Sequence, residues 1–97
     1  MLNCNLNKQG TFACTELQYV KCGFRPTNIN ILVPYSNGSH RIFLYNANYN
    51  VSVFMVNEME ITMPSSKDGI TTNVRLYVDD NGFYFLPFAN AYYYASK

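Results

Sequence analysis

The sequence predicts a small all-β protein, an antiparallel β-sandwich of about six to eight short strands. Three observations lead to this prediction. Hydrophobic residues make up 48% of the 97 residues and charged residues only 13%, a balance typical of a folded core and not of disorder. Nine Tyr and seven Phe suit pleated, half-buried surfaces. Thirteen Asn, together with Gly and Pro, divide the chain into short segments, none of which has a long helical period.

A chain of this length builds a single core, so we expect one domain over residues 1–97. Residues 1–10 could form an extended N-terminal arm. Residues 11–22 have apolar spacings that would fit one or two helical turns, but their Thr, Tyr and Val side chains favour a strand, which we predict. The next predicted strand, residues 29–33, lies between Pro26 and Pro34, which disfavour a helix there.

The middle of the chain contains a strong hairpin signal. Residues 36–39 read Ser-Asn-Gly-Ser, and Asn-Gly tolerates the positive φ angles of a tight turn. The turn leads into a predicted strand at residues 41–45, which is apolar or aromatic on both faces. After a loop at residues 46–50, the β-branched segment 51–56 predicts a buried strand. Alternating polar and apolar residues then predict a half-exposed strand at 58–63.

The last third of the chain repeats this pattern of strands and turns. Residues 71–78 alternate, with Val74, Leu76 and Val78 on one face. Asp-Asp-Asn-Gly at residues 79–82 predicts a tight turn into a strand at 83–86. After Pro87, a final strand is expected over residues 91–95.

Charge and cysteine content exclude several classes of function. The formal net charge of +1 comes from scattered residues, so no basic patch for nucleic acid is visible. Residues 1–7 are polar, so we expect no secretory signal, and no apolar run approaches the ~20 residues that a membrane helix needs. Cys4, Cys14 and Cys22 are odd in number and match no zinc spacing, so we expect reduced, buried and inert thiols.

The search for catalytic residues finds none that we assign. His40 is the only imidazole, and it lies just after the Asn-Gly turn, where an exposed His is common. Glu58 and Glu60 would stand about 7 Å apart on one strand face, but they fit a solvated face better than a catalytic pair. The acidic turn at residues 79–82 lacks the ligand spacing of a calcium loop. We therefore expect no enzyme, no metal site and no cofactor.

Aromatic residues are the better candidates for binding. On a strand, Tyr92 and Tyr94 share one face while Tyr93 takes the other, so one face fills the core and the other carries rings outward. We favour a subunit interface over a ligand platform, because low charge and surplus aromatic surface suggest an oligomer. The candidate binding residues are Tyr92, Tyr94, Tyr93, Arg41 and His40.

Three motifs in the same order resemble a small β-sandwich domain found in structural and fibre proteins of tailed bacteriophages. They are Cys-Gly-Phe-Arg-Pro-Thr-Asn-Ile-Asn-Ile at residues 22–31, Asp-Asn-Gly-Phe-Tyr-Phe at 80–85 and Tyr-Tyr-Tyr-Ala-Ser-Lys at 92–97. The order is also similar to that of the H-type lectins, β-sandwiches that form trimers or pairs of trimers. The lectins usually carry Trp where this chain has Tyr93, and their other sugar-contacting positions do not align, so no binding residue is transferred.

The resemblance implies a virion structural protein: a fibre, tail-tip, receptor-binding or head-decoration module. It implies a homotrimer or a multiple of three, other virion proteins as partners, and host adhesion through a cell-surface glycan as a further role. Assembly would take place in the bacterial cytoplasm, without a signal peptide. Because the chain starts at Met1 and ends with the last strand, we expect a free-standing module.

Three other functions stay open. A glycan-binding lectin would show a saturable sugar response that is lost on substitution of a Tyr or of Arg41. A small enzyme would lose its activity on His40→Ala, whereas a small protein inhibitor or ligand-binding domain would pair tightly with its target. A binder of single-stranded nucleic acid would use Tyr77 and Tyr84 as stacking platforms and would depend steeply on salt, but the scattered charges make it the least favoured.

Overall fold

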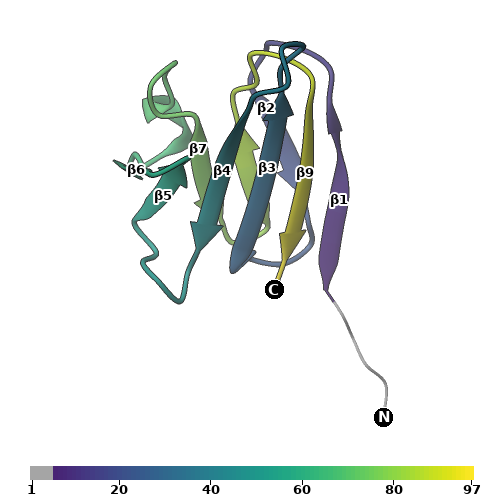
Figure 1. Ribbon diagram of the computed structural model, residues 1–97. Helices are drawn as coiled ribbons and strands as arrows, with labels where there is room; N and C mark the ends of the chain where they lie inside the picture. The colour runs from purple at the N-terminus through teal and green to yellow at the C-terminus, as the bar shows by residue number, and fades with distance from the viewer. Residues whose placement is uncertain (1–5) are drawn as a thin grey trace.

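Two antiparallel sheets face each other in the computed structural model, which describes residues 6–97 (Figure 1). The larger sheet has the strand order β1-β9-β3-β4-β5-β6 and the smaller has the order β2-β8-β7. A short 3-10 turn, η1, lies between β6 and β7. The elements of this part of the chain are β1 (Asn7–Phe12), β2 (Gln18–Lys21), β3 (Asn28–Pro34), β4 (His40–Asn46), β5 (Val53–Val56), β6 (Met59–Thr62), η1 (Lys67–Gly69), β7 (Leu76–Asp79), β8 (Gly82–Phe85) and β9 (Ala91–Ser96). The predicted β-sandwich is confirmed.

The last strand, β9, lies inside the larger sheet, between β1 and β3 (Figure 1). Both pairings are antiparallel, and Tyr93 is opposite Gly10 on one side and Ile31 on the other. The C-terminal strand therefore joins the first strand to the rest of the sheet.

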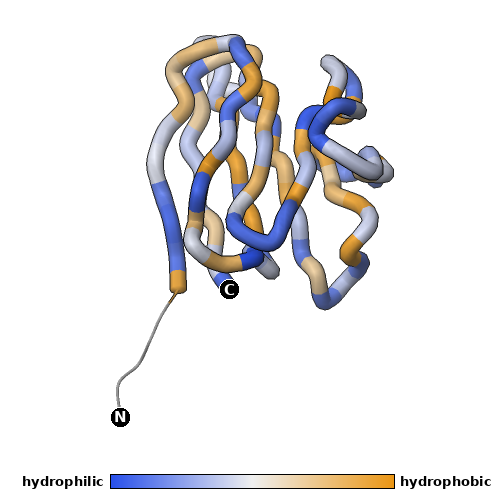
Figure 2. Tube along the Cα trace, turned by 180° about the vertical axis from the view of Figure 1, so that it is seen from behind, coloured by the Kyte–Doolittle hydropathy of each residue, from blue (hydrophilic) through white to orange (hydrophobic). Residues whose placement is uncertain are grey.

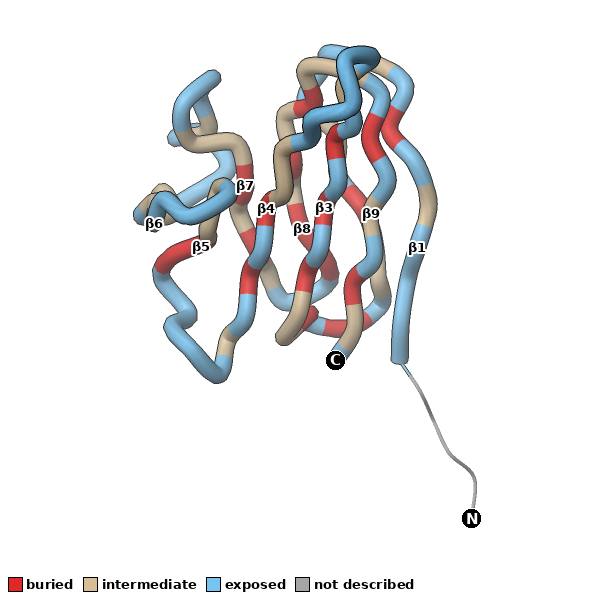
Figure 3. The backbone as a smooth tube through the Cα atoms, viewed as in Figure 1, coloured by how far each residue is buried: buried red, intermediate tan, exposed pale blue. Residues whose placement is uncertain are grey.

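Alternation along the strands places the core between the two sheets. On β3, Ile29, Ile31 and Val33 are fully buried, whereas the residues between them are exposed (Figure 3). Aromatic rings meet in the middle of the sandwich, where Phe43 of the larger sheet contacts Phe85 of the smaller sheet edge to face, with 5.0 Å between centroids. Burying these apolar side chains is the main favourable contribution to the folding of a domain this small.

Both predicted hairpin turns are present. Residues 35–39 connect β3 to β4, and Gly38 has the positive φ of 90° that the Asn-Gly signal indicates. Between β7 and β8, Asp79 pairs with Gly82, so Asp80 and Asn81 form a two-residue turn.

Several predicted boundaries are wrong. Residues 11–22 do not form one strand, because β1 ends at Phe12 and β2 begins at Gln18, which brings the number of strands among residues 6–97 to nine. The segment 51–56 becomes a strand only at Val53, because Val51 lies in the preceding turn and is 56% exposed. The segment 71–78 becomes a strand only at Leu76. In the turn before it, the backbones of Thr71 and Val74 hydrogen-bond to each other.

The expected N-terminal arm is partly an edge strand. From Asn7 onward its residues belong to β1 and pair with β9, and Figure 2 shows that the first half of this strand is hydrophilic. Residues 1–5, which include Cys4, lie outside the described residues. Cys14 and Cys22 are free and only partly buried, and desolvation raises the pKa of the Cys22 thiol, which disfavours a reactive thiolate. No helix among residues 6–97 is long and apolar enough to cross a membrane.

Candidate functional site

The outward side of the larger sheet carries an apolar surface that no other element of residues 6–97 covers. Two rows of residues cross the strands there. In the first, Tyr92 lies between Thr11 and Leu32, and Leu32 pairs in turn with Ile42. In the second row the order is Gln9, Tyr94, Asn30, Leu44 and Met55. We call these two rows the outer face.

The outer face is exposed and uncharged. Tyr92 is 56% exposed, and Tyr94, Leu32 and Leu44 are each about 40% exposed. None of the side chains in these two rows is charged, and Glu60 of β6, which pairs with Met55, lies at the edge where the second row ends. A shallow groove of about 590 Å³ runs along the face between its tyrosine and leucine side chains. An exposed apolar surface of this kind is typical of a protein–protein interface, because an isolated domain gains nothing from leaving it in water.

Tyr93 does not share this surface, as its place in the strand predicts. Its ring turns inward and lies 4.9 Å from Phe12 and 5.7 Å from Phe83, measured between centroids. Gly10 gives it room, because a Cβ there would lie 2.7 Å from the Tyr93 hydroxyl oxygen. Burial raises the pKa of this phenol. The structure therefore separates Tyr93, a core residue, from the binding candidates Tyr92 and Tyr94.

The smaller sheet carries a row of three tyrosines on its own outward side. Tyr19, Tyr84 and Tyr77 are neighbours across β2, β8 and β7, with centroid distances of 4.5 and 6.3 Å. The Tyr19 hydroxyl donates to Asp79 Oδ1 at 3.0 Å, and desolvation together with this hydrogen bond raises the pKa of Tyr19 to about 12. The Asp79 carboxylate at the end of this row would repel the phosphates of a nucleic acid, so the row does not favour the binding of single-stranded nucleic acid.

Arg41 lies on the other side of β4 from the outer face, whereas His40 lies on the same side as Ile42, just beyond the first row. His40 is exposed at the start of β4. Arg41 lies over the ring of Phe88, with its Cζ 5.2 Å from the centroid, and Arg75 lies over the same ring at 4.6 Å. No pattern in the sequence marks Arg75 or Phe88, because the stacking of the two arginines on Phe88 arises only when the two sheets pack together. The five predicted binding residues therefore do not form one site.

Three acidic residues have hydrogen-bond or ion-pair partners. Glu60 accepts a hydrogen bond from the Tyr49 hydroxyl at 2.7 Å, whereas Glu58 lies in the turn before β6. Asp79 accepts from the Asn81 backbone N–H and stabilises the β7–β8 turn. Asp80 forms an ion pair with Arg25 at 2.9 Å. Within residues 6–97 no three His, Cys, Asp or Glu side chains are grouped closely enough to hold a metal ion.

Comparison with known proteins adds no relative. No protein-family model matches the chain, and neither a curated protein nor a solved structure is significantly similar to it. The resemblance to phage structural domains and H-type lectins stays a prediction from the three sequence motifs.

Proposed function

We propose that this protein is a non-enzymatic assembly module that associates with copies of itself through the outer face, as a structural component of a bacteriophage particle. The observation that carries the proposal is the outer face itself, two cross-strand rows of exposed apolar and uncharged polar side chains centred on Tyr92, Leu32 and Leu44. Tyr and Leu side chains bury large apolar areas when a partner covers them.

A second copy of the chain is the occupant that the chemistry favours. The two rows carry no charge and Glu60 lies only at their β6 edge, so the face offers little electrostatic complement to an acidic or basic partner. An uncharged apolar face can pack against a different part of the same face on a second copy, which is the heterologous contact that a three-membered ring requires. The resemblance to trimeric lectins makes a trimer, or a multiple of three, the expected state.

The three resemblance motifs contact one another in the fold. The backbone N–H groups of Cys22 and Gly23, from the first motif, donate to the carbonyl oxygen of Asn81 in the second at 2.8 and 3.0 Å. Arg25 and Asp80 join the same two motifs by their ion pair.

The first and third motifs also meet, because residues 28–32 of β3 pair with residues 92–96 of β9. Three segments that are distant in sequence thus form one structural unit. A shared fold is the physical reason for such motifs to occur together in one order.

Light scattering coupled to size exclusion tests the assembly. At about 100 µM, where a specific association is populated, we expect a mass of three chains or a multiple of three. Leu44→Glu should give a monomer, because it places a charge inside the interface.

Leu17→Glu is the matched control. Leu17 has nearly the same exposure as Leu44, 42% against 40%, but lies in the loop before β2. It should leave the oligomer intact. A monomeric wild-type protein, or an equal effect of the two substitutions with circular dichroism unchanged, would contradict the proposal.

A further inference from the structure

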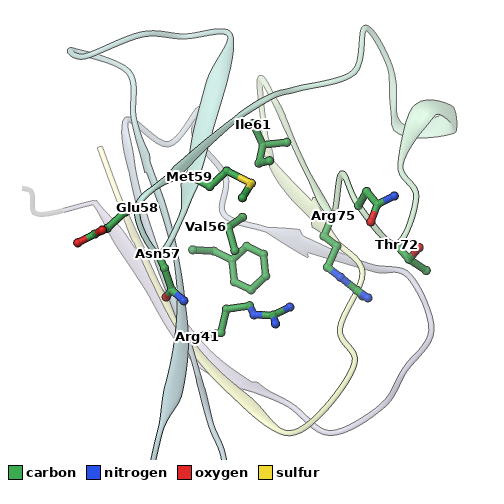
Figure 4. Close-up of a pocket in the computed structure, with 10 residues that line it drawn as sticks. Arg41, Val56, Asn57, Glu58, Met59, Ile61, Thr72 and Arg75 are labelled. Carbon is green, nitrogen blue, oxygen red and sulfur yellow. The ribbon is translucent and has the colours of Figure 1, made fainter.

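A cleft of about 820 Å³ opens at the end of the sandwich, between the β4–β6 part of the larger sheet and the segment that leads into β7 (Figure 4). It shares no residue with the outer face, so a ligand bound here would give the protein a function separate from the proposed assembly. Apolar side chains line one part of it and hydrogen-bonding side chains the rest. The lining residues are Arg41, Phe43, Val56, Asn57, Glu58, Met59, Ile61, Thr72, Asn73 and Arg75.

Two arginines from different sheets meet in this cleft. Arg41 belongs to β4 of the larger sheet, and Arg75 directly precedes β7 of the smaller sheet. Both guanidinium groups lie over the ring of Phe88. The Nη1 of Arg75 also donates to the carbonyl oxygen of Leu86 at 2.8 Å, which fixes this guanidinium group but leaves most of its N–H donors unused.

The two positive charges have no carboxylate partner within residues 6–97. The ion pairs in this part of the chain are Arg25 with Asp80 and Lys67 with Asp68, both away from the cleft. Glu58 lines the cleft but its side chain points away from the two guanidinium groups (Figure 4). Desolvation, followed by the charge of Arg41, lowers the pKa of Arg75. A bound anion would relieve the repulsion between the two cations.

We propose that this arginine cleft binds an oxyanion, either a carboxylate or a phosphate ester, that is carried on a hydroxylated body such as a sugar. Guanidinium groups present planar pairs of N–H donors that match the two oxygens of such a group. The stacking of both arginines on the Phe88 ring also holds their guanidinium planes in place, which lowers the entropy cost of binding an anion.

Polar side chains around the arginines would recognise the hydroxyl groups. Asn57 is held by its Oδ1, which accepts from the Ile42 backbone N–H at 2.9 Å, so its amide NH₂ is free to donate. Thr72 approaches from the other side of the cleft, next to Arg75 (Figure 4), and Asn73 also lines the cleft. The apolar walls keep water from competing for the charged contacts, which strengthens them.

Calorimetric titration of the whole chain tests the site and separates the two sources of the anion. The probes are glucuronate for a carboxylate, glucose 6-phosphate for a phosphate ester, and glucose as the neutral control. We expect at least one of the acids to bind and glucose not to bind. Raising the salt from about 50 mM to about 500 mM should weaken the binding, because the contacts are ionic.

Arg41→Gln is the decisive variant, since the Arg41 side chain makes no hydrogen bond with residues 6–97 whose loss would disturb the fold. It should lower the affinity at least about ten-fold, the usual scale of a charge-assisted hydrogen bond. Arg25→Gln makes the same charge change at the opposite end of β7 and should leave the affinity unchanged.

Three results would overturn the proposal: no binding of either acid at about 10 mM, binding of glucose as tight as that of the acids, or equal losses in the two variants. Leu44→Glu, which should abolish assembly, should keep the cleft intact, so failure of one proposal is distinguishable from failure of the other.

Discussion

Replacing Tyr45 with Phe should make the protein more stable, although most substitutions in a core destabilise. Tyr45 lies on β4, is 2% exposed, and its hydroxyl has no hydrogen-bond partner among residues 6–97. A buried hydroxyl without a partner costs about 1–3 kcal/mol of desolvation. Phe keeps the ring and its packing and removes only the oxygen, so we expect the free energy of unfolding to rise by about 1–2 kcal/mol.

Urea unfolding, followed by circular dichroism, measures this difference. For a domain of this size, 1 kcal/mol corresponds to about 4–8 °C in Tm, so a thermal melt provides a second reading. Tyr49→Phe is the matched control. Tyr49 is exposed and its hydroxyl donates to Glu60, so the same change there should cost at most about 1 kcal/mol. A loss of stability in Tyr45→Phe would refute the reasoning, since it would mean that the hydroxyl is satisfied in solution.

Two further predictions follow from local geometry. Gly82→Ala should lower the free energy of unfolding by about 3 kcal/mol, because a Cβ at Gly82 would overlap the backbone carbonyl oxygen of Val20. Gly38→Ala should cost only about 1 kcal/mol, since nothing lies near that site and only its positive φ opposes a side chain. Tyr19 should ionise near pH 12 in a tyrosinate absorbance titration, and Asp79→Asn should lower this pKa. Because the pKa of Tyr19 is raised in the folded state, its contribution to stability is complete below pH 10 and is lost as the pH rises from about 10 to 12.

Local signals predicted the hairpins and most of the core. The Asn-Gly sequence at residues 36–39 and the Asp-Asn-Gly sequence at 79–82 act through their own backbone preferences, so no tertiary information was needed. Strands buried on one face also show the alternation that their burial requires, as β3 does.

The missed boundaries have a physical cause in tertiary pairing. β1 begins with the polar residues Asn7, Lys8 and Gln9, because it is an edge strand in which only Phe12 is buried. No apolar alternation marks such a strand in the sequence. Conversely, Val51 and residues 71–74 look like strand but have no neighbouring strand with which to pair, so they form turns.

The two candidate surfaces differ in how far the sequence could predict them. Tyr92 and Tyr94 were predictable, because two alternate positions on one strand must share a face. The arginine cleft was not predictable from the sequence. Arg41 lies on β4 of the larger sheet and Arg75 directly precedes β7 of the smaller sheet, so the two meet only over Phe88. A site built between layers depends on how the layers pack, and no spacing along the chain encodes that distance.

The three resemblance motifs lie mainly outside the two candidate binding surfaces. Gly23 has a φ of 83°, and its N–H donates to the carbonyl oxygen of Asn81, so these residues stabilise the backbone of the sandwich. The arginine cleft has no residue in any of the three motifs, and the outer face shares with them Asn30, Tyr92 and Tyr94. Two chains with the same motifs would therefore share this sandwich while differing in the surfaces that bind, and the function of each must be argued from its own exposed residues.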